Sequence, residues 1–187
     1  SPELRDRQVH LAQRRIWREH TFSRRATQLL ESVGIVDPKA WRRPRVSIIA
    51  PTIRPHLVPG IIATAGRQAG VEVQLALLLH GFDAVDAELQ ALAREAGIAE
   101  LIVLRADRTT SLGANLNRLV EATDGEIVAK FDDDDLYGQH YLADASFALD
   151  YSGAELVGKE ARYLYLEAID ATVLQNPHRE HRWADLV

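Results

Sequence analysis

The 187-residue sequence contains no cysteine and no methionine, and only 6% of its residues are aromatic. Without cysteine, the chain has no disulfide bond and no thiolate ligand for a metal. No apolar run is long enough to span a membrane, and the polar, arginine-rich first forty residues lack the apolar segment of a signal peptide. We therefore expect a cytoplasmic protein without a transmembrane segment. Because the chain does not begin with methionine, we also expect a piece of a longer protein.

Charge is distributed unevenly in a composition that is otherwise ordinary for a globular protein, with 47% hydrophobic and 26% charged residues. Residues 1–45 carry eleven Lys and Arg against five Asp and Glu, whereas residues 46–187 carry eleven against twenty-two. The second part is therefore strongly acidic. An acidic surface repels the phosphates of nucleic acid, so we expect no nucleic-acid partner.

The N-terminal residues have the periodicity of two helices. Thr21 is a suitable N-cap for the second helix, Gly34 is a suitable end, and apolar residues recur between them at helical spacing. Arginines line the polar faces, either as a solvated surface or as a docking surface for phosphate or an acidic partner. We expect residues 1–44 to form a helical segment and linker, and residues 45–187 to form a separate domain.

Strands and helices alternate from residue 45 onward. The expected strands are 46–50, 71–79, 101–104 and 127–131, and the expected helices are 59–68, 84–96 and 111–122. Single helices between strands predict an α/β fold with a mostly parallel, Rossmann-like sheet. Pro51 is expected to end the first strand. Toward the C-terminus, residues 155–157 and 162–166 are expected to be short strands, and residues 175–183 a loop.

Four consecutive aspartates, Asp132 to Asp135, follow the apolar run at residues 126–131. Adjacent carboxylates repel one another unless they share a cation, and hard oxygen ligands suit Mg²⁺, Mn²⁺ or Ca²⁺. In open α/β sheets, ligands bind just beyond the carboxyl ends of strands. The run therefore predicts a divalent-cation site, the alternative being an acidic surface loop. Because a strand alternates its side chains, we expect Asp132 and Asp134 to point one way and Asp133 and Asp135 the other.

Several motifs occur together in a specific order. They are a first strand ending in Pro51-Thr52, an asparagine-bearing helix over residues 112–117, Asp124-Gly125-Glu126-Ile127, and Phe131 with the four aspartates and Tyr137. Over roughly residues 45–165 this combination resembles an inverting family 2 glycosyltransferase of the GT-A fold, with the aspartates similar to its Asp-x-Asp motif. The resemblance implies Mn²⁺- or Mg²⁺-dependent transfer from a nucleotide-diphosphate sugar, expected to be a UDP-sugar, to a saccharide or other hydroxyl acceptor.

The resemblance also implies roles for individual residues. Asp134 is expected to ligate the metal directly, and Asp132 to contact the ribose or reach the metal through water. A register shift of one residue would give the ligand role to Asp133. Thr52 and Arg54 are expected to frame the nucleotide, with Arg54 either meeting a phosphate or lying exposed in a loop.

Two further residues are implied less directly. Asn117 resembles the asparagine that helps to close the nucleotide pocket, although a helix-surface asparagine is the alternative. His80 stands where the family has an aspartate that accepts a hydrogen bond from the base, and it is either a substitute or a bystander. The identity of the nucleotide base stays open for that reason.

An inverting transferase needs a carboxylate that deprotonates the acceptor hydroxyl. The family has a Glu-Asp pair for this purpose, and the acidic residues after Tyr137 all stand singly. We therefore expect the base to lie outside this chain and residues 45–187 to lack the acceptor half.

Two other functions compete with this interpretation. A sugar-nucleotide nucleotidyltransferase would need a glycine-rich loop after the first strand, and residues 50–55 contain no glycine. A non-catalytic nucleotide- or metal-binding module is the second alternative. Separately, residues 20–30 are similar to the closing helices of spore-maturation-type GT-B glycosyltransferases, which implies a second transferase domain upstream.

Overall fold

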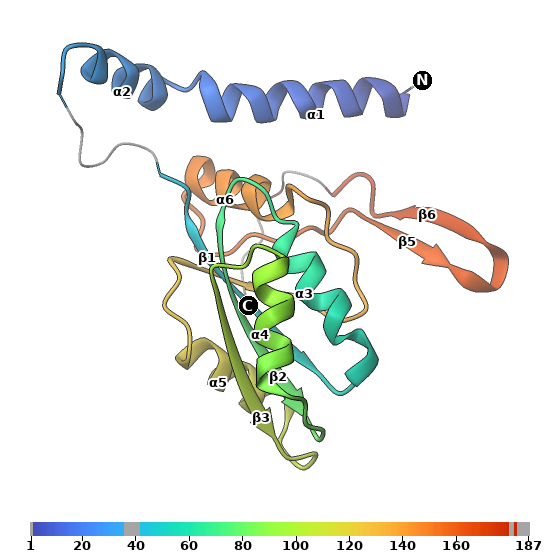
Figure 1. The fold of residues 1–187 in the computed structure, drawn as a ribbon. Coiled ribbons are helices and arrows are strands. Elements are labelled where there is room, and N and C mark those ends of the chain that lie inside the picture. The colour runs from blue at the N-terminus through green and yellow to red at the C-terminus, as the bar shows by residue number, and fades with distance from the viewer. Residues whose placement is uncertain (1, 36–41, 180–181, 183–187) are drawn as a thin grey trace. The chain divides into compact units, whose positions relative to one another are not determined.

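The computed structural model describes residues 2–35, 42–179 and 182. The chain divides into two compact units, Ser1–Phe147 and Ala148–Val187, and Figure 1 shows the order of their elements. Within the described ranges, no helix has both the length and the apolar content needed to cross a membrane.

The first unit begins with two helices, α1 (Pro2–Glu19) and α2 (Phe22–Ser32), which confirms the prediction for this segment. The Thr21 hydroxyl caps α2 by accepting a hydrogen bond from the backbone N–H of Arg24 at 3.3 Å. Gly34 has φ +79°, the left-handed conformation that commonly ends a helix. The linker expected at residues 37–44 lies mostly outside the described residues.

Four parallel strands form the sheet of this unit, as predicted. They are β1 (Arg45–Thr52), β2 (Glu72–His80), β3 (Glu100–Ala106) and β4 (Ile127–Lys130). Their order in the sheet is β3-β2-β1-β4, and all three pairings are parallel. Because β1 and β2 are the central strands, both are buried on both faces, which explains their nearly continuous apolar sequences.

The expectation that Pro51 ends the first strand is wrong, since β1 continues to Thr52. The Ile49 carbonyl accepts from the Phe131 N–H at 3.0 Å, so Ile49 faces β4. Pro51, two residues further, faces the same side. The pairing with β4 already ends at Ile49 opposite Lys130. The N–H that proline lacks would therefore have had no partner there, and the strand tolerates it.

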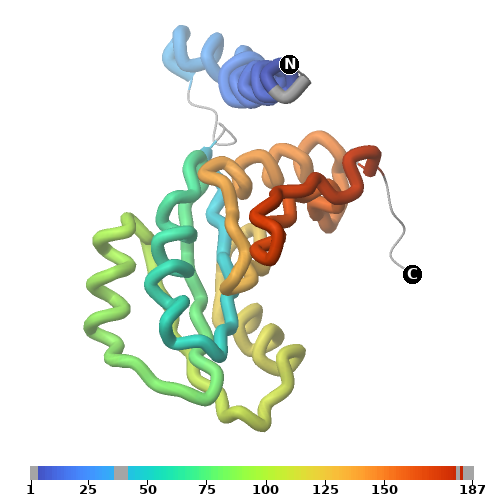
Figure 2. The backbone as a smooth tube through the Cα atoms, turned by 90° about the vertical axis from the view of Figure 1, so that its right-hand side faces the viewer, coloured from blue at the N-terminus to red at the C-terminus, as the bar shows by residue number. Residues whose placement is uncertain are grey.

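Helices cover both faces of the sheet, as Figure 2 shows. They are α3 (Val58–Gly66), which follows a 3₁₀ turn at Pro55–Leu57, α4 (Asp86–Glu95) and α5 (Leu112–Glu121). The apolar residues of α3 and α4 pack against the face of the sheet that includes Leu75 and Leu77. On the other face, Leu119 of α5 packs against Ile49 and Leu78.

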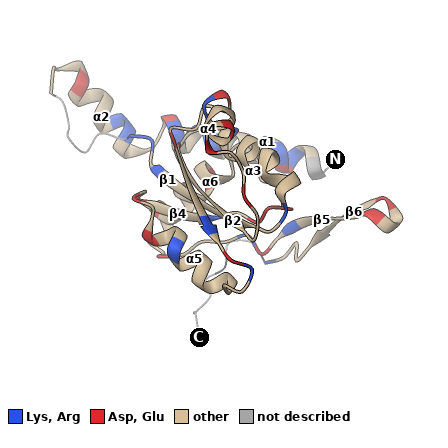
Figure 3. Cartoon of the chain, turned by 60° about the horizontal axis from the view of Figure 1, so that its bottom comes forward, with Lys and Arg blue, Asp and Glu red and all other residues tan. Residues whose placement is uncertain are grey.

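An ion-pair cluster ties the amino ends of the strands together. The Arg45 guanidinium lies 2.9 Å from Glu72, 2.6 Å from Glu100 and 3.0 Å from Asp124. The hydrogen bond with Arg45 is the main reason that the pKa of Asp124 lies below its usual value. Figure 3 shows that acidic and basic residues are interspersed along the helices and strand ends of the unit. Such mixed pairs balance charge locally in an acidic chain.

Gly125 leads into β4 at this same edge and lies tightly against β1. Its N–H donates to the Ser47 hydroxyl at 2.9 Å. A Cβ atom at Gly125 would lie 2.3 Å from the Ser47 Oγ and 2.7 Å from the Ser47 backbone nitrogen, so a larger residue does not fit without a backbone shift. This contact fixes where β4 starts.

The helix α6 (Tyr141–Ser152) begins in the first unit, where the Arg14 side chain of α1 pairs with Asp144 at 2.9 Å. The second unit contains the antiparallel hairpin of β5 (Arg162–Leu166) and β6 (Ala171–Gln175). Of the short strands expected in this region, residues 162–166 are confirmed, whereas residues 155–157 are irregular. The partner strand β6 was not predicted, because its alternation is too short to be distinguished from a loop.

Candidate functional site

The carboxyl ends of β1 and β4 carry the polar residues that the sequence singled out. Because the two strands are parallel neighbours, Thr52 at the end of β1 and the aspartates after β4 meet at one edge of the sheet. This is the edge at which α/β proteins bind ligands.

The aspartates do not continue the strand. β4 ends at Lys130, and the Asp135 N–H approaches the Asp132 carbonyl at 3.4 Å, which closes a turn with Asp133 and Asp134 at its centre. The predicted alternation along the run is therefore wrong. Instead of pointing in opposite directions, Asp133 and Asp134 both reach the same side chain, Arg54.

Arg54 and Thr52 together donate three hydrogen bonds to the Asp133 carboxylate. The Arg54 Nε donates to Asp133 Oδ2 at 3.0 Å, and its Nη2 donates to Oδ1. The Thr52 hydroxyl also donates to Oδ2, at 2.5 Å. The Arg54 Nη2 lies 2.9 Å from Asp134 Oδ2 as well, so two carboxylates converge on one cationic nitrogen. The two hydrogen bonds from Arg54 to the two oxygens of Asp133 form a bidentate arginine–carboxylate pair, which is the strong type.

The two carboxylates differ in their exposure. The Asp133 side chain is 10% exposed and that of Asp134 is 60% exposed. Burial opposes ionisation of Asp133, but the hydrogen bonds from Arg54 and Thr52 outweigh it and hold the pKa of this carboxyl below its usual value. The pKa of Arg54 is raised first by its hydrogen bond to Asp133 and second by its hydrogen bond to Asp134. Both partners are therefore charged at neutral pH.

Two stacked aromatic side chains, on either side of the aspartates in the sequence, support the aspartate turn. The buried Phe131 ring stacks on Tyr137 with ring centres 3.7 Å apart and planes 4° from parallel. The Tyr137 oxygen accepts a hydrogen bond from the Asp132 N–H at 2.9 Å, and the Asp132 carboxylate pairs with Lys130. Burial, followed by the charges of Asp135 and Asp132, raises the pKa of Tyr137 to about 12. The phenol thus stays protonated and holds the turn at neutral pH.

The two remaining predicted residues lie elsewhere on the sheet edge and on α5. His80 ends β2, and its Nε2 is buried without a hydrogen-bond partner among the described residues. Asn117 is exposed on α5.

Sequence reasoning missed Asn115, two residues before Asn117 on the same helix. Asn115 is fully buried, and neither its amide oxygen nor its amide nitrogen has a partner within the described part of the chain. A buried amide without partners is costly, so such groups call for an explanation. The sequence places Asn115 one helical turn before Leu119, and the packing of Leu119 in the structure shows that this face of α5 is buried.

Comparisons with known protein families and with curated proteins find no match for this chain. Solved structures that are partly similar include a mannosyltransferase, PcManGT from Pyrobaculum calidifontis, in complex with GDP-Man and Mn²⁺. It has 24% identity and a TM-score of 0.49 over 58% of this chain and 33% of its own. Two structures of S. aureus TarS have 17% and 16% identity and TM-scores of 0.49 and 0.48 over 64% of this chain.

The chain spans 24–40% of the length of those structures. The functional assignment therefore rests on the geometry of the site itself.

The donor atoms at the aspartate turn fit a hard divalent cation. Mg²⁺ and Mn²⁺ favour oxygen ligands, and Mg²⁺ commonly takes one or two carboxylates together with substrate phosphates and water. Asp133 and Asp134 supply two carboxylates at one point. Within the described residues, no three His, Asp or Glu side chains are gathered as a complete metal site. A cation here would need further oxygens from a phosphate or from water.

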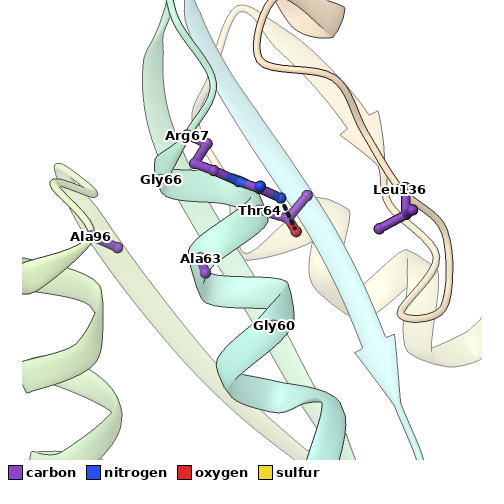
Figure 4. A pocket seen from close by; sticks show the side chains of 7 residues that line it. All are labelled: Gly60, Ala63, Thr64, Gly66, Arg67, Ala96 and Leu136. Carbon is purple, nitrogen blue, oxygen red and sulfur yellow. Dashed lines mark hydrogen bonds between the residues drawn. The ribbon is translucent and has the colours of Figure 1, made fainter.

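An open groove of about 500 Å³ lies beside α3. Figure 4 shows the side chains that line it. Its lining consists of Gly60, Ala63, Thr64, Gly66 and Arg67, with Ala96 and Leu136. The Arg67 Nη2 donates to the Thr64 hydroxyl at 3.2 Å, and Leu136 from the loop after the aspartates is 94% exposed. The groove offers an apolar wall beside that loop and no carboxylate, so the charged chemistry belongs to the sheet edge.

Proposed function

We propose that this chain contains the nucleotide-sugar-binding part of a metal-dependent, inverting glycosyltransferase of the family 2 GT-A type. One observation carries the proposal: the carboxylates of Asp133 and Asp134 converge on Arg54 at the carboxyl edge of a parallel sheet. Carboxylates suit a divalent cation, and an arginine fork suits a phosphate. A cation and a diphosphate are the two charged parts that binding of a nucleotide-diphosphate sugar brings together.

In this proposal Asp134 is the direct metal ligand, because its carboxylate is exposed and already faces a cation. Asp132 contacts the ribose or reaches the metal through water. The Asp133 side chain is only 10% exposed, and it orients Arg54 and Thr52. When bound, a divalent cation supplies a Lewis acid for the charge that develops on the leaving diphosphate. Arg54 adds a second positive charge for the same phosphates.

The donor is proposed to be a UDP-sugar and the acceptor a saccharide or other hydroxyl compound. His80 lies at the end of β2, where its side chain is proposed to contact the base. Asn117 remains a proposed pocket residue through the position of its helix. The carboxylate base for the acceptor is proposed to lie outside this chain.

Thermal unfolding in the presence of nucleotides tests this function. UDP and GDP, each with Mn²⁺, Mg²⁺ or EDTA, are compared with UMP, which lacks the second phosphate. A nucleoside diphosphate at about 100 times its Kd should add about 2.7 kcal/mol of stability, and only in the presence of metal. For a chain of this size, that gain corresponds to an increase in Tm of about 5–11 °C.

Three results discriminate between the alternatives. Equal stabilisation in EDTA contradicts a metal bridge, and equal stabilisation by UMP contradicts diphosphate recognition. If neither nucleoside diphosphate stabilises the protein under any condition, the chain does not bind a nucleotide donor and the proposed function is wrong.

A further inference from the structure

Arg54 lies at the meeting point of two carboxylates that the proposed function assigns to a metal site. Its Nη2 contacts Asp133 Oδ1 and lies 2.9 Å from Asp134 Oδ2, while its Nε lies 3.0 Å from Asp133 Oδ2. A guanidinium in this position neutralises the oxygens that a divalent cation would otherwise ligate. A metal and Arg54 are therefore alternative cations for the same acidic turn.

The turn needs a cation even without metal. Asp132 pairs with Lys130, and Asp133 and Asp134 share Arg54, so two side-chain cations face three neighbouring carboxylates. The Asp133 side chain is only 10% exposed, so water stabilises its charge poorly. Arg54 supplies that stabilisation from within the chain.

The Arg54 backbone is held in place while its side chain remains accessible. The Thr52 hydroxyl accepts from the Arg54 N–H at 3.0 Å, which anchors the residue to the end of β1. The side chain is 39% exposed. Movement of the guanidinium from a carboxylate to a ligand phosphate therefore requires rotation of the side chain and no movement of the strand.

We propose that Arg54 is a tethered cation that couples metal binding to diphosphate binding. Metal that takes Asp134 withdraws this carboxylate from Arg54 and leaves two positive groups close together. A diphosphate relieves that repulsion, because it gives Arg54 an anionic partner of its own. Each ligand then raises the affinity for the other by the same factor, as linkage requires. This inference rests on the proposed function, since it takes the diphosphate to be the second ligand.

Titration with Mn²⁺, followed by the electron paramagnetic resonance signal of the free ion, tests the proposal without any activity assay. The wild-type chain is compared with Arg54→Gln, with and without inorganic pyrophosphate, after correction for the Mn²⁺ that pyrophosphate itself binds. Arg105→Gln is the matched control, because Arg105 is also 39% exposed and pairs with two aspartates, Asp83 at 2.6 Å and Asp86 at 2.7 Å.

In the wild type, pyrophosphate should lower the Kd for Mn²⁺ by about 5- to 150-fold, the usual range for coupled sites. Arg54→Gln should bind Mn²⁺ alone more tightly than the wild type, because the competing cation is gone. Its coupling to pyrophosphate should fall below that of the wild type, and the remainder reports the direct contact between phosphate and metal. Arg105→Gln should behave like the wild type in both measurements.

The proposal is overturned if Arg54→Gln binds Mn²⁺ alone no more tightly than the wild type, or if it keeps the wild-type coupling. Absence of Mn²⁺ binding in both proteins also overturns it. Should Arg54→Gln not fold, Arg54→Lys decides, since it keeps the charge but loses the fork and should lie between the two. Failure of the proposed function is separate, because it appears as absent stabilisation of the wild type by UDP and GDP.

Discussion

Replacing Asn115 with Leu should make the protein more stable. Asn115 is 0% exposed and both of its amide atoms lack partners among the described residues. Leucine has the same branched skeleton of heavy atoms without the polar groups. A buried polar group left without a partner costs about 1–3 kcal/mol, so its removal should raise the free energy of unfolding by a similar amount. In a chain of this size, Tm should rise by about 2–12 °C.

The chain offers a matched control for this experiment. Asn117 lies on the same helix but is exposed, so Asn117→Leu reports only the difference in helix propensity, which is below about 0.7 kcal/mol. Asn115→Ala removes the amide without adding volume and separates crowding from the loss of a hydrogen bond. Differential scanning calorimetry of the four proteins gives the comparison directly.

The reasoning is refuted if both Asn115→Leu and Asn115→Ala lower the stability by more than about 2 kcal/mol, because the amide would then have a partner such as a buried water. Binding of UDP with Mn²⁺ is measured on the same samples. Increased stability together with weakened binding would show that the amide is retained for a ligand, since function commonly costs stability. Unchanged binding would remove Asn115 from the site.

Two further outcomes are expected at the aspartate turn. Asp134→Ala should abolish metal-dependent binding of UDP with little change in Tm. Asp133→Ala should lower the free energy of unfolding by about 1–3 kcal/mol, because Arg54 and Thr52 lose the carboxylate to which they donate hydrogen bonds. If Asp134→Ala binds UDP like the wild type and Asp133→Ala does not, the ligand role belongs to Asp133. The pKa of Tyr137 is raised to about 12 by burial, so its contribution to stability should be complete below about pH 10 and lost as the pH rises through 12. Absorbance at 295 nm should show a tyrosinate transition near pH 12 that is missing in Tyr137→Phe, and an unchanged transition would contradict the assignment.

The four strands of the parallel sheet, the helices between them and the edge that carries the aspartates were predictable, because each depends on a local pattern of apolar residues. Parallel pairing then placed Thr52 and the aspartates at one edge. The pairing of Arg54 with Asp133 and Asp134 was not predictable, because it depends on the turn that begins once β4 ends at Lys130. A sequence pattern locates a strand to within a few residues, whereas the direction of a side chain changes with every residue.

The choice between the two asparagines of α5 shows the same limit. The resemblance pointed to Asn117, and the structure buries Asn115 instead. Both assignments concern a helix that was predicted correctly. Only the packing of Leu119 against the sheet identifies which face of that helix is turned inward.

Four identical residues in a row cannot define their own alignment. If β4 slid by one residue along β1, an aspartate would still replace an aspartate at most places beside Thr52. The register of β4 against β1 is therefore fixed by the residues around the run. Gly125 leaves no space for a side chain against Ser47, and a slip would exchange the buried Phe131 ring for a charged neighbour. During sequence divergence, Gly125 and Phe131 should therefore tolerate fewer substitutions than the individual aspartates of the run.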